Sequence, residues 1–127
     1  MATVGQSAAK VVAVESNGLA VFDLRHNLAM ADVDHEIVRE PFESDALTGS
    51  WDLAIVDPPR DGLGADGVAT VARGGPRSLA YVSCDPASLA RDARLLVDAG
   101  YRLERATPVD MFPQTFHIET VVLFTRS

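Results

Sequence analysis

Apolar and polar residues follow one another along the chain in blocks that predict strands and helices in turn. Short apolar runs predict strands at residues 10–15, 36–39, 51–57 and 78–83. Helical spacing and capping patterns predict helices at about 19–31, 65–73 and 85–97. Two more strands are predicted at 101–106 and 119–125. The segment between them is too short for a crossover helix, so we expect them to be antiparallel.

This alternation predicts an α/β fold with an open, mostly parallel sheet, helices on both faces and an antiparallel C-terminal strand. A chain of 127 residues, 47% of them hydrophobic, suits a single domain over residues 1–127. No apolar run approaches the roughly eighteen residues that a membrane span needs. The one cysteine cannot form an internal disulfide, which favours a cytoplasmic location.

The net charge changes the picture of possible partners. At −7 it argues against a broad phosphate-binding surface, because such surfaces are usually basic. Either the chain does not bind nucleic acid, or the basic surface lies on a part of the protein outside these residues.

Reactive residues gather where the predicted strands end. Glu15, Asp57 and Cys84 each follow a strand, and in open α/β sheets ligands bind beyond the carboxyl ends of the strands. A carboxylate such as Glu15 can accept both hydroxyls of a ribose, but a solvated acid at a strand end fits equally well. Two prolines after Asp57 predict a rigid loop that suits a binding site; the alternative is a turn that merely ends the strand.

Cys84 lies between a predicted strand and a predicted helix. The positive end of a helix dipole favours a thiolate nucleophile, although a lone cysteine is more often a small buried residue. Asp85 would oppose the thiolate unless it caps the helix. Glu119 opens the last strand, where burial suits a proton acceptor. The residues alone favour a surface pair of Glu119 and His117 at that position.

Three segments resemble the C-terminal motifs of the RNA uridine-5-methyltransferases. They are Asp57-Pro-Pro-Arg60-x-Gly-Leu-Gly, then Ser-Cys84-Asp-Pro-Ala-Ser-Leu-Ala-Arg-Asp, then Asp110-Met-Phe-Pro-Gln-Thr-x-His-x-Glu119. They occur in family order, and the resemblance covers roughly residues 10–127. It implies a Rossmann-like class I methyltransferase sheet, S-adenosylmethionine as cofactor, and transfer or ribosomal RNA as the substrate of the complete protein.

The resemblance also implies roles for four residues. Cys84 would attack carbon 6 of uridine, and Glu119 would remove the proton from the methylated carbon 5. Asp57 would lie beside cofactor and target base, and Glu15 would bind the ribose of the cofactor. The catalytic set is therefore Cys84, Glu119 and Asp57, the cofactor set is Glu15 and Asp57, and we assign no metal ligand.

The chain departs from the family at its start. The glycine-rich loop that normally precedes the strand ending at Glu15 has no counterpart, because residues 1–9 contain only Gly5. We therefore expect a sheet without its first strand, with a gap between 10–15 and 53–57. Direct pairing of these strands, or a homodimer through exposed edges, would repair it.

A missing recognition module would explain the acidic charge as well. Within the motifs, Asp85 stands where the family commonly has asparagine. The second interpretation, from another functional class, is a non-catalytic methyltransferase-like remnant that binds no cofactor.

Overall fold

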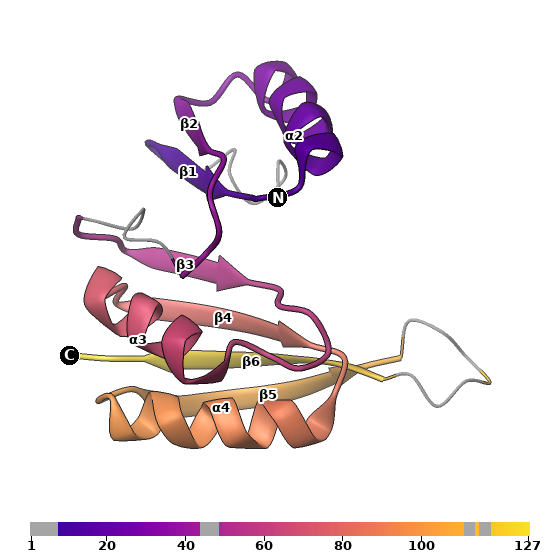
Figure 1. Ribbon diagram of the computed structural model, residues 1–127. Coiled ribbons are helices and arrows are strands. Elements are labelled where there is room, and N and C mark those ends of the chain that lie inside the picture. The colour runs from indigo at the N-terminus through magenta and orange to yellow at the C-terminus, as the bar shows by residue number, and fades with distance from the viewer. Residues whose placement is uncertain (1–7, 44–48, 111–113, 115–117) are drawn as a thin grey trace. The chain divides into compact units, whose positions relative to one another are not determined.

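The computed structural model describes residues 8–43, 49–110, 114 and 118–127 (Figure 1). The chain divides into two compact units, Met1–Ala46 and Leu47–Ser127. Among the described residues, no helix is long and apolar enough to span a membrane.

The first unit contains one strand–helix–strand segment. Its elements are β1 (Val11–Val14), α2 (Gly18–Met30) and β2 (His35–Val38), and the two strands pair in parallel. Helix α2 begins after Asn17, whose side-chain oxygen accepts hydrogen bonds from the first free amides of the helix. Ala13, Val21 and Leu28 are buried and form its small apolar core.

The second unit carries a four-stranded sheet. Its elements are β3 (Leu53–Val56), α3 (Gly64–Gly74), β4 (Ser78–Ser83), α4 (Pro86–Asp98), β5 (Arg102–Val109) and β6 (Glu119–Thr125). The strand order is β3-β4-β6-β5. Strand β6 is antiparallel to both β4 and β5, so β3, β4 and β5 run in one direction. The mostly parallel sheet with an antiparallel C-terminal strand is thus confirmed.

Helices α3 and α4 lie side by side over one face of this sheet (Figure 1). The side chains of β4 alternate between buried and half-buried, as expected when one face of a strand is covered. Leu79, Tyr81, Leu96, Val122 and Phe124 are each at most 1% exposed and form the core between sheet and helices. Both helices of this unit cover the same face, so the expectation of helices on both faces is not met within the unit.

The predicted elements are all present, with shifts of a few residues at their ends. The largest shift is in β5, which continues to Val109, three residues beyond the predicted strand. The two ranges expected to flank a gap belong to different sheets, β1 with β2 and β3 with β4. This agrees with a sheet that lacks its first strand. Dimerisation through exposed edges stays a prediction.

Candidate functional site

Three of the predicted site residues lie at one edge of the four-stranded sheet, here named the Cys84 edge. It is formed by the carboxyl ends of β3 and β4 and by the start of β6. Val56 pairs with Tyr81, and Ser83 pairs with Thr120. Asp57 directly follows Val56, Cys84 directly follows Ser83, and Glu119 directly precedes Thr120. The strand register therefore brings Asp57, Cys84 and Glu119 to one edge, separated by 27 to 62 residues in sequence (84 − 57 and 119 − 57).

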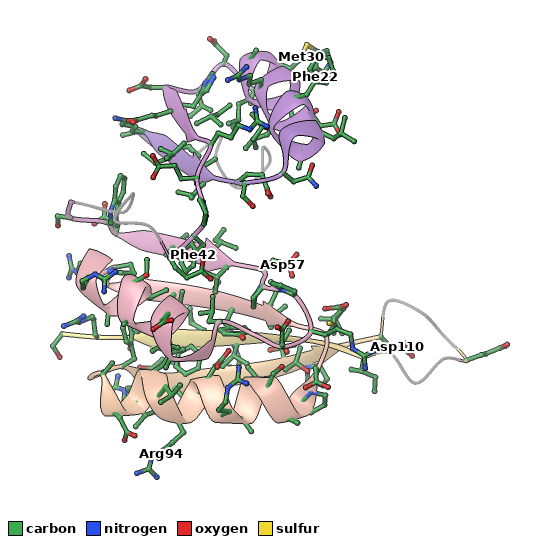
Figure 2. The ribbon with its side chains drawn as sticks, viewed as in Figure 1. Phe22, Met30, Phe42, Asp57, Arg94 and Asp110 are labelled. Carbon is green, nitrogen blue, oxygen red and sulfur yellow. The ribbon has the colours of Figure 1, made fainter. Side chains whose placement is uncertain are left out.

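Asp57 is exposed at this edge. Figure 2 shows it at the end of β3, on the side of the sheet where Asp110 follows β5. The structure gives its carboxylate no hydrogen bond to another described residue. The following prolines lead into a turn, in which the amide of Gly62 donates to the carbonyl of Pro59 over 2.8 Å. Asp57 thus presents an exposed carboxylate at the start of a constrained loop.

Cys84 is a half-buried free thiol in the turn between β4 and α4. The residues on either side of the cysteine, Ser83 and Asp85, are joined by two hydrogen bonds. Ser83 Oγ accepts from the amide of Asp85 (3.1 Å) and donates to the carbonyl of Asp85 (2.9 Å). The backbone around Cys84 is therefore held by hydrogen bonds of its two neighbours.

Asp85 caps helix α4. Its Oδ2 accepts from the amide of Ser88 at 2.8 Å, and Pro86 occupies the first helical position. Hydrogen bonds from Ser88, aided by the positive charge of Arg60, hold the pKa of the Asp85 carboxyl below its usual range. Asp85 thus caps the helix, which is the condition under which its charge was not expected to oppose a thiolate at Cys84.

The loop that begins at Asp57 rests on the first turns of α4. Ser88 Oγ donates to the carbonyl of Arg60 over 2.7 Å. One turn further, the Arg91 guanidinium donates to the carbonyl of Asp61. These contacts join the loop after β3 to the helix that follows Cys84.

Asp92 is the residue that sequence reasoning missed. Its side chain is fully buried, and Oδ2 accepts from the Leu63 amide and the Tyr81 hydroxyl, both at 2.6 Å. Oδ1 accepts from the amide of Gly64 at 3.2 Å and from Arg91 Nε at 3.0 Å. Burial, together with the hydrogen bond to Asp92, raises the pKa of the Tyr81 hydroxyl far above its ordinary value. Its spacing of four residues from Ser88 and from Leu96 was a signal that Asp92 lies on the buried face of α4.

Gly62 lies directly against this cluster. Its φ is +77°, and a Cβ at this position would collide with Asp92 Oδ2 and crowd Arg91 Nη2 and the Tyr81 hydroxyl. The position therefore requires glycine both for its backbone and for the space beside the carboxylate.

Glu119 is half-buried at the start of β6 and pairs with Val109 of β5. His117, the partner favoured by the residues alone, lies outside the described residues. The structure thus places Glu119 at the Cys84 edge without deciding between a proton acceptor and a surface pair.

Glu15 belongs to the first unit, so the structure does not group it with the other three. Its amide donates to the carbonyl of Val38 at 3.0 Å, and its Oε1 accepts from the amide of Asn17 at 2.7 Å. Oε2 has no hydrogen bond to another described residue. One carboxylate oxygen thus shapes the turn before α2, while no described residue engages the other.

A cavity of about 370 Å³ lies at the opposite edge of the four-stranded sheet. It is lined by Asp52, Arg77, Ser78, Thr125 and Arg126. Ser78 begins β4, whereas Cys84 follows its end, so this cavity is remote from the Cys84 edge. Within the described ranges, no group of three His, Cys, Asp or Glu side chains could hold a metal ion.

The family model of the tRNA (uracil-5-)-methyltransferases matches residues 45–127. An uncharacterised RNA methyltransferase of Thermotoga maritima is 41% identical over 126 residues, covering 94% of this chain. One from Enterococcus faecalis is 37% identical and covers 98% of the chain. The chain spans only 28% and 29% of the length of these two relatives.

Solved structures of methyltransferases also resemble this chain. The tRNA (uracil-54, C5)-methyltransferase of Pyrococcus abyssi, in complex with S-adenosyl-L-homocysteine, has a TM-score of 0.85 and 33% identity. The match covers 98% of this chain and 31% of that chain. Magnesium protoporphyrin IX methyltransferase from Synechocystis has a TM-score of 0.74 at 13% identity, which shows likeness of fold alone. The expected Rossmann-like methyltransferase fold, in truncated form, is confirmed.

Proposed function

Because this chain belongs to the tRNA (uracil-5-)-methyltransferase family, we propose that it is the catalytic part of an enzyme that methylates carbon 5 of uridine in RNA. The proposed methyl donor is S-adenosylmethionine. One observation carries the proposal. Asp57, Cys84 and Glu119, which match the family motifs, come together at the Cys84 edge through the strand register.

Cys84 is proposed as the nucleophile. Carbon 5 of uracil is a poor nucleophile until a group adds to carbon 6. The Cys84 thiolate forms a bond to carbon 6, and the electron pair of the C5–C6 double bond moves toward the carbonyl at carbon 4. Carbon 5 thereby becomes nucleophilic. The turn held by Ser83 and Asp85 supports this role, since a fixed nucleophile loses little orientational freedom in the reaction.

The residues present fit part of a cofactor site. Glu15 directly follows β1, and one of its carboxylate oxygens has no partner among the described residues, which suits a ribose hydroxyl; Asp57 directly follows β3 with an exposed carboxylate. When bound, S-adenosylmethionine supplies the methyl group that carbon 5 accepts. Residues 1–9 contain no counterpart of the family's glycine-rich loop, so Glu15 and Asp57 are only part of the set of residues that a complete cofactor site needs.

Glu119 is proposed as the base that completes the reaction. After methyl transfer, carbon 5 still carries its proton. The Glu119 carboxylate takes that proton, the electron pair restores the C5–C6 double bond, and the bond to Cys84 breaks to release the thiolate. Its position next to Thr120, which pairs with the residue before Cys84, supports this assignment.

The RNA substrate is proposed for the complete protein. The Pyrococcus abyssi neighbour acts on tRNA by its own description, and transfer or ribosomal RNA is the expected class here. With a net charge of −7, this chain is poorly suited to bind the phosphate backbone, so recognition would rest on the sequence outside it. The cytoplasmic location and the homodimer stay predictions.

An RNA with 5-fluorouridine tests the mechanism. Fluorine at carbon 5 cannot be removed as a proton, so the enzyme stays attached through Cys84 after methyl transfer. The protein tested should be full-length, with these 127 residues in place of the matching segment of the Thermotoga maritima relative. We expect a covalent adduct on a denaturing gel that Cys84→Ala abolishes and that Asp98→Asn, at an exposed residue of α4, retains. An adduct with Cys84→Ala would refute the assignment.

A non-catalytic remnant is the second candidate, since residues 1–9 hold no counterpart of the family's glycine-rich loop. Titration calorimetry of the full-length protein described above with S-adenosylmethionine separates the two. Binding in the micromolar range supports a catalytic part, whereas no heat of binding at millimolar cofactor supports the remnant.

A further inference from the structure

We infer that Asp92 is a positioning residue, which fixes the loop carrying Asp57 against the strand and helix that flank Cys84. The inference rests on the proposed function, since it concerns the geometry of that site. Asp92 has no hydrogen bond to Asp57 or Cys84 themselves. It acts through the backbone of residues 60–64 and through Tyr81.

Besides the exposed Arg91, the buried face of α4 holds this loop through two polar side chains. Ser88, Asp92 and Leu96 are four residues apart, so they lie above one another on the helix, and all three are buried. Leu96 packs into the core, while Ser88 and Asp92 present polar atoms to the loop. Ser88 binds the carbonyl of Arg60, and Asp92 binds the amides of Leu63 and Gly64. Two successive helical turns thus hold both ends of one short segment.

The contacts of Asp92 favour a single conformation of that segment. A buried carboxylate is costly unless donors satisfy its oxygens. Here two backbone amides, the Tyr81 hydroxyl and the Arg91 guanidinium supply them. If the loop moved, the two amides would leave a fully buried charge partly unsatisfied. The loop conformation and the burial of Asp92 therefore stabilise each other.

The same carboxylate joins the two strands that carry the reactive residues. Tyr81 lies in β4, three residues before Cys84, and Leu63 lies in the loop six residues after Asp57. Both donate to Asp92 Oδ2 at 2.6 Å. A shift of about 1 Å between reacting groups can lower a rate roughly 100-fold. The Asp92 contacts oppose such a shift between the loop after β3 and the turn after β4.

Asp92→Asn and Asp98→Asn form a matched pair for the structural test. Both replace an aspartate by its amide on α4, but Asp98 is exposed at the end of the helix and, among the described residues, pairs with Arg94 alone. In the 127-residue chain, we expect amide exchange in peptides covering 60–64 to be at least about 10-fold faster for Asp92→Asn, because the new amide group presents donors to donors. We expect no change for Asp98→Asn.

The catalytic test uses the full-length protein and the 5-fluorouridine RNA, at a temperature where circular dichroism shows each variant to be folded. We expect the rate of adduct formation at saturating RNA to fall roughly 100-fold for Asp92→Asn, with RNA affinity unchanged. Tyr81→Phe removes one donor, keeps the charge and folds more readily. We expect it to slow the reaction about 10-fold.

The outcomes separate this inference from the proposed function. If the unmodified protein forms no adduct, the proposed function is wrong. Amide exchange at 60–64 then still tests whether Asp92 fixes the loop. Normal rates in folded Asp92→Asn and Tyr81→Phe overturn the inference and leave the proposed function intact. If Asp92→Asn does not fold, Tyr81→Phe decides alone, by a slower rate or an unchanged one.

Discussion

Helices α2 and α4 begin in the same way and end up in different surroundings. Each has 13 residues, follows a parallel strand, and starts after an Asn or Asp whose side chain accepts from a helix amide. Helix α4 buries Ser88, Asp92 and Leu96, and two of these hold the neighbouring loop.

Helix α2 buries only Val21 and Leu28. On its other side Leu19, Phe22 and Met30 are 82%, 72% and 77% exposed, and Figure 2 shows Phe22 and Met30 at the surface of the helix. The same start signal therefore produces a helix in both places, but only α4 has tertiary contacts that organise a site. Four tests of this contrast follow, in order of decreasing predicted effect.

Gly62→Ala should disturb the contacts of α4 most. We expect the free energy of unfolding to fall by about 2 to 5 kcal/mol, from about 1–2 kcal/mol for the left-handed backbone and about 1–3 kcal/mol for a displaced buried acceptor. Urea unfolding followed by the fluorescence of Trp51, the single tryptophan, reports on this unit.

Gly64→Ala is the control for Gly62→Ala. Its φ is also positive, at +66°, but no atom lies within 4 Å of the added Cβ. Only the backbone cost of about 1–2 kcal/mol is then expected. Equal losses for the two variants would show that Asp92 does not restrict the loop.

Leu96→Ala and Leu19→Ala compare the packing of the two helices. Leu96 is fully buried, and we expect a loss of about 3 kcal/mol from lost burial and the cavity left behind. Leu19 is 82% exposed, and its replacement should change stability by less than about 0.5 kcal/mol. Urea titrations followed by far-UV circular dichroism measure both. A large loss for Leu19→Ala would show that another surface covers α2.

Asn17→Ala tests the start of α2. Loss of the two capping hydrogen bonds, at 2.9 and 3.2 Å, should cost about 1 kcal/mol. Hydrogen exchange in peptides covering 18–30 should accelerate, while peptides covering 86–98 stay unchanged. Asn17→Asp keeps the acceptor and should restore protection; if it does not, the cap is not what stabilises the helix.

Asp85 makes the start of α4 sensitive to pH. Its pKa is lowered in the folded chain by hydrogen bonds from Ser88, so it contributes stability above an unfolded pKa of about 4. That contribution is lost as the pH falls through the lower folded pKa. Asp85→Asn keeps the acceptor but cannot titrate. The difference in urea midpoint between the two proteins should therefore shrink from pH 6 to pH 2.5, and a constant difference would contradict the assignment.

Local patterns predicted most of the fold. Apolar runs, helical spacing and the residues before Leu19 and Pro86 located every strand and helix in the described parts of the chain, because these signals act over a few residues. The antiparallel last strand followed from the short connection before it. The meeting of Asp57 and Cys84 at one edge could be expected as well, since parallel strands share an edge at their carboxyl ends.

The role of Asp92 could not be found in this way. Its partners Leu63 and Tyr81 lie 29 and 11 residues away in the sequence, and no spacing rule connects them. Asp85 presented a similar difficulty: the sequence offered a charge that opposes a thiolate and a cap that uses the charge, and geometry decided for the cap.

The starts of α2 and α4 can be read from the sequence, because a cap needs only amides within three residues of it. What each helix contacts depends on the folded structure. A buried carboxylate such as Asp92 must find donors wherever the chain brings them, and α4 finds them in the loop after β3, whereas α2 presents an apolar face to solvent.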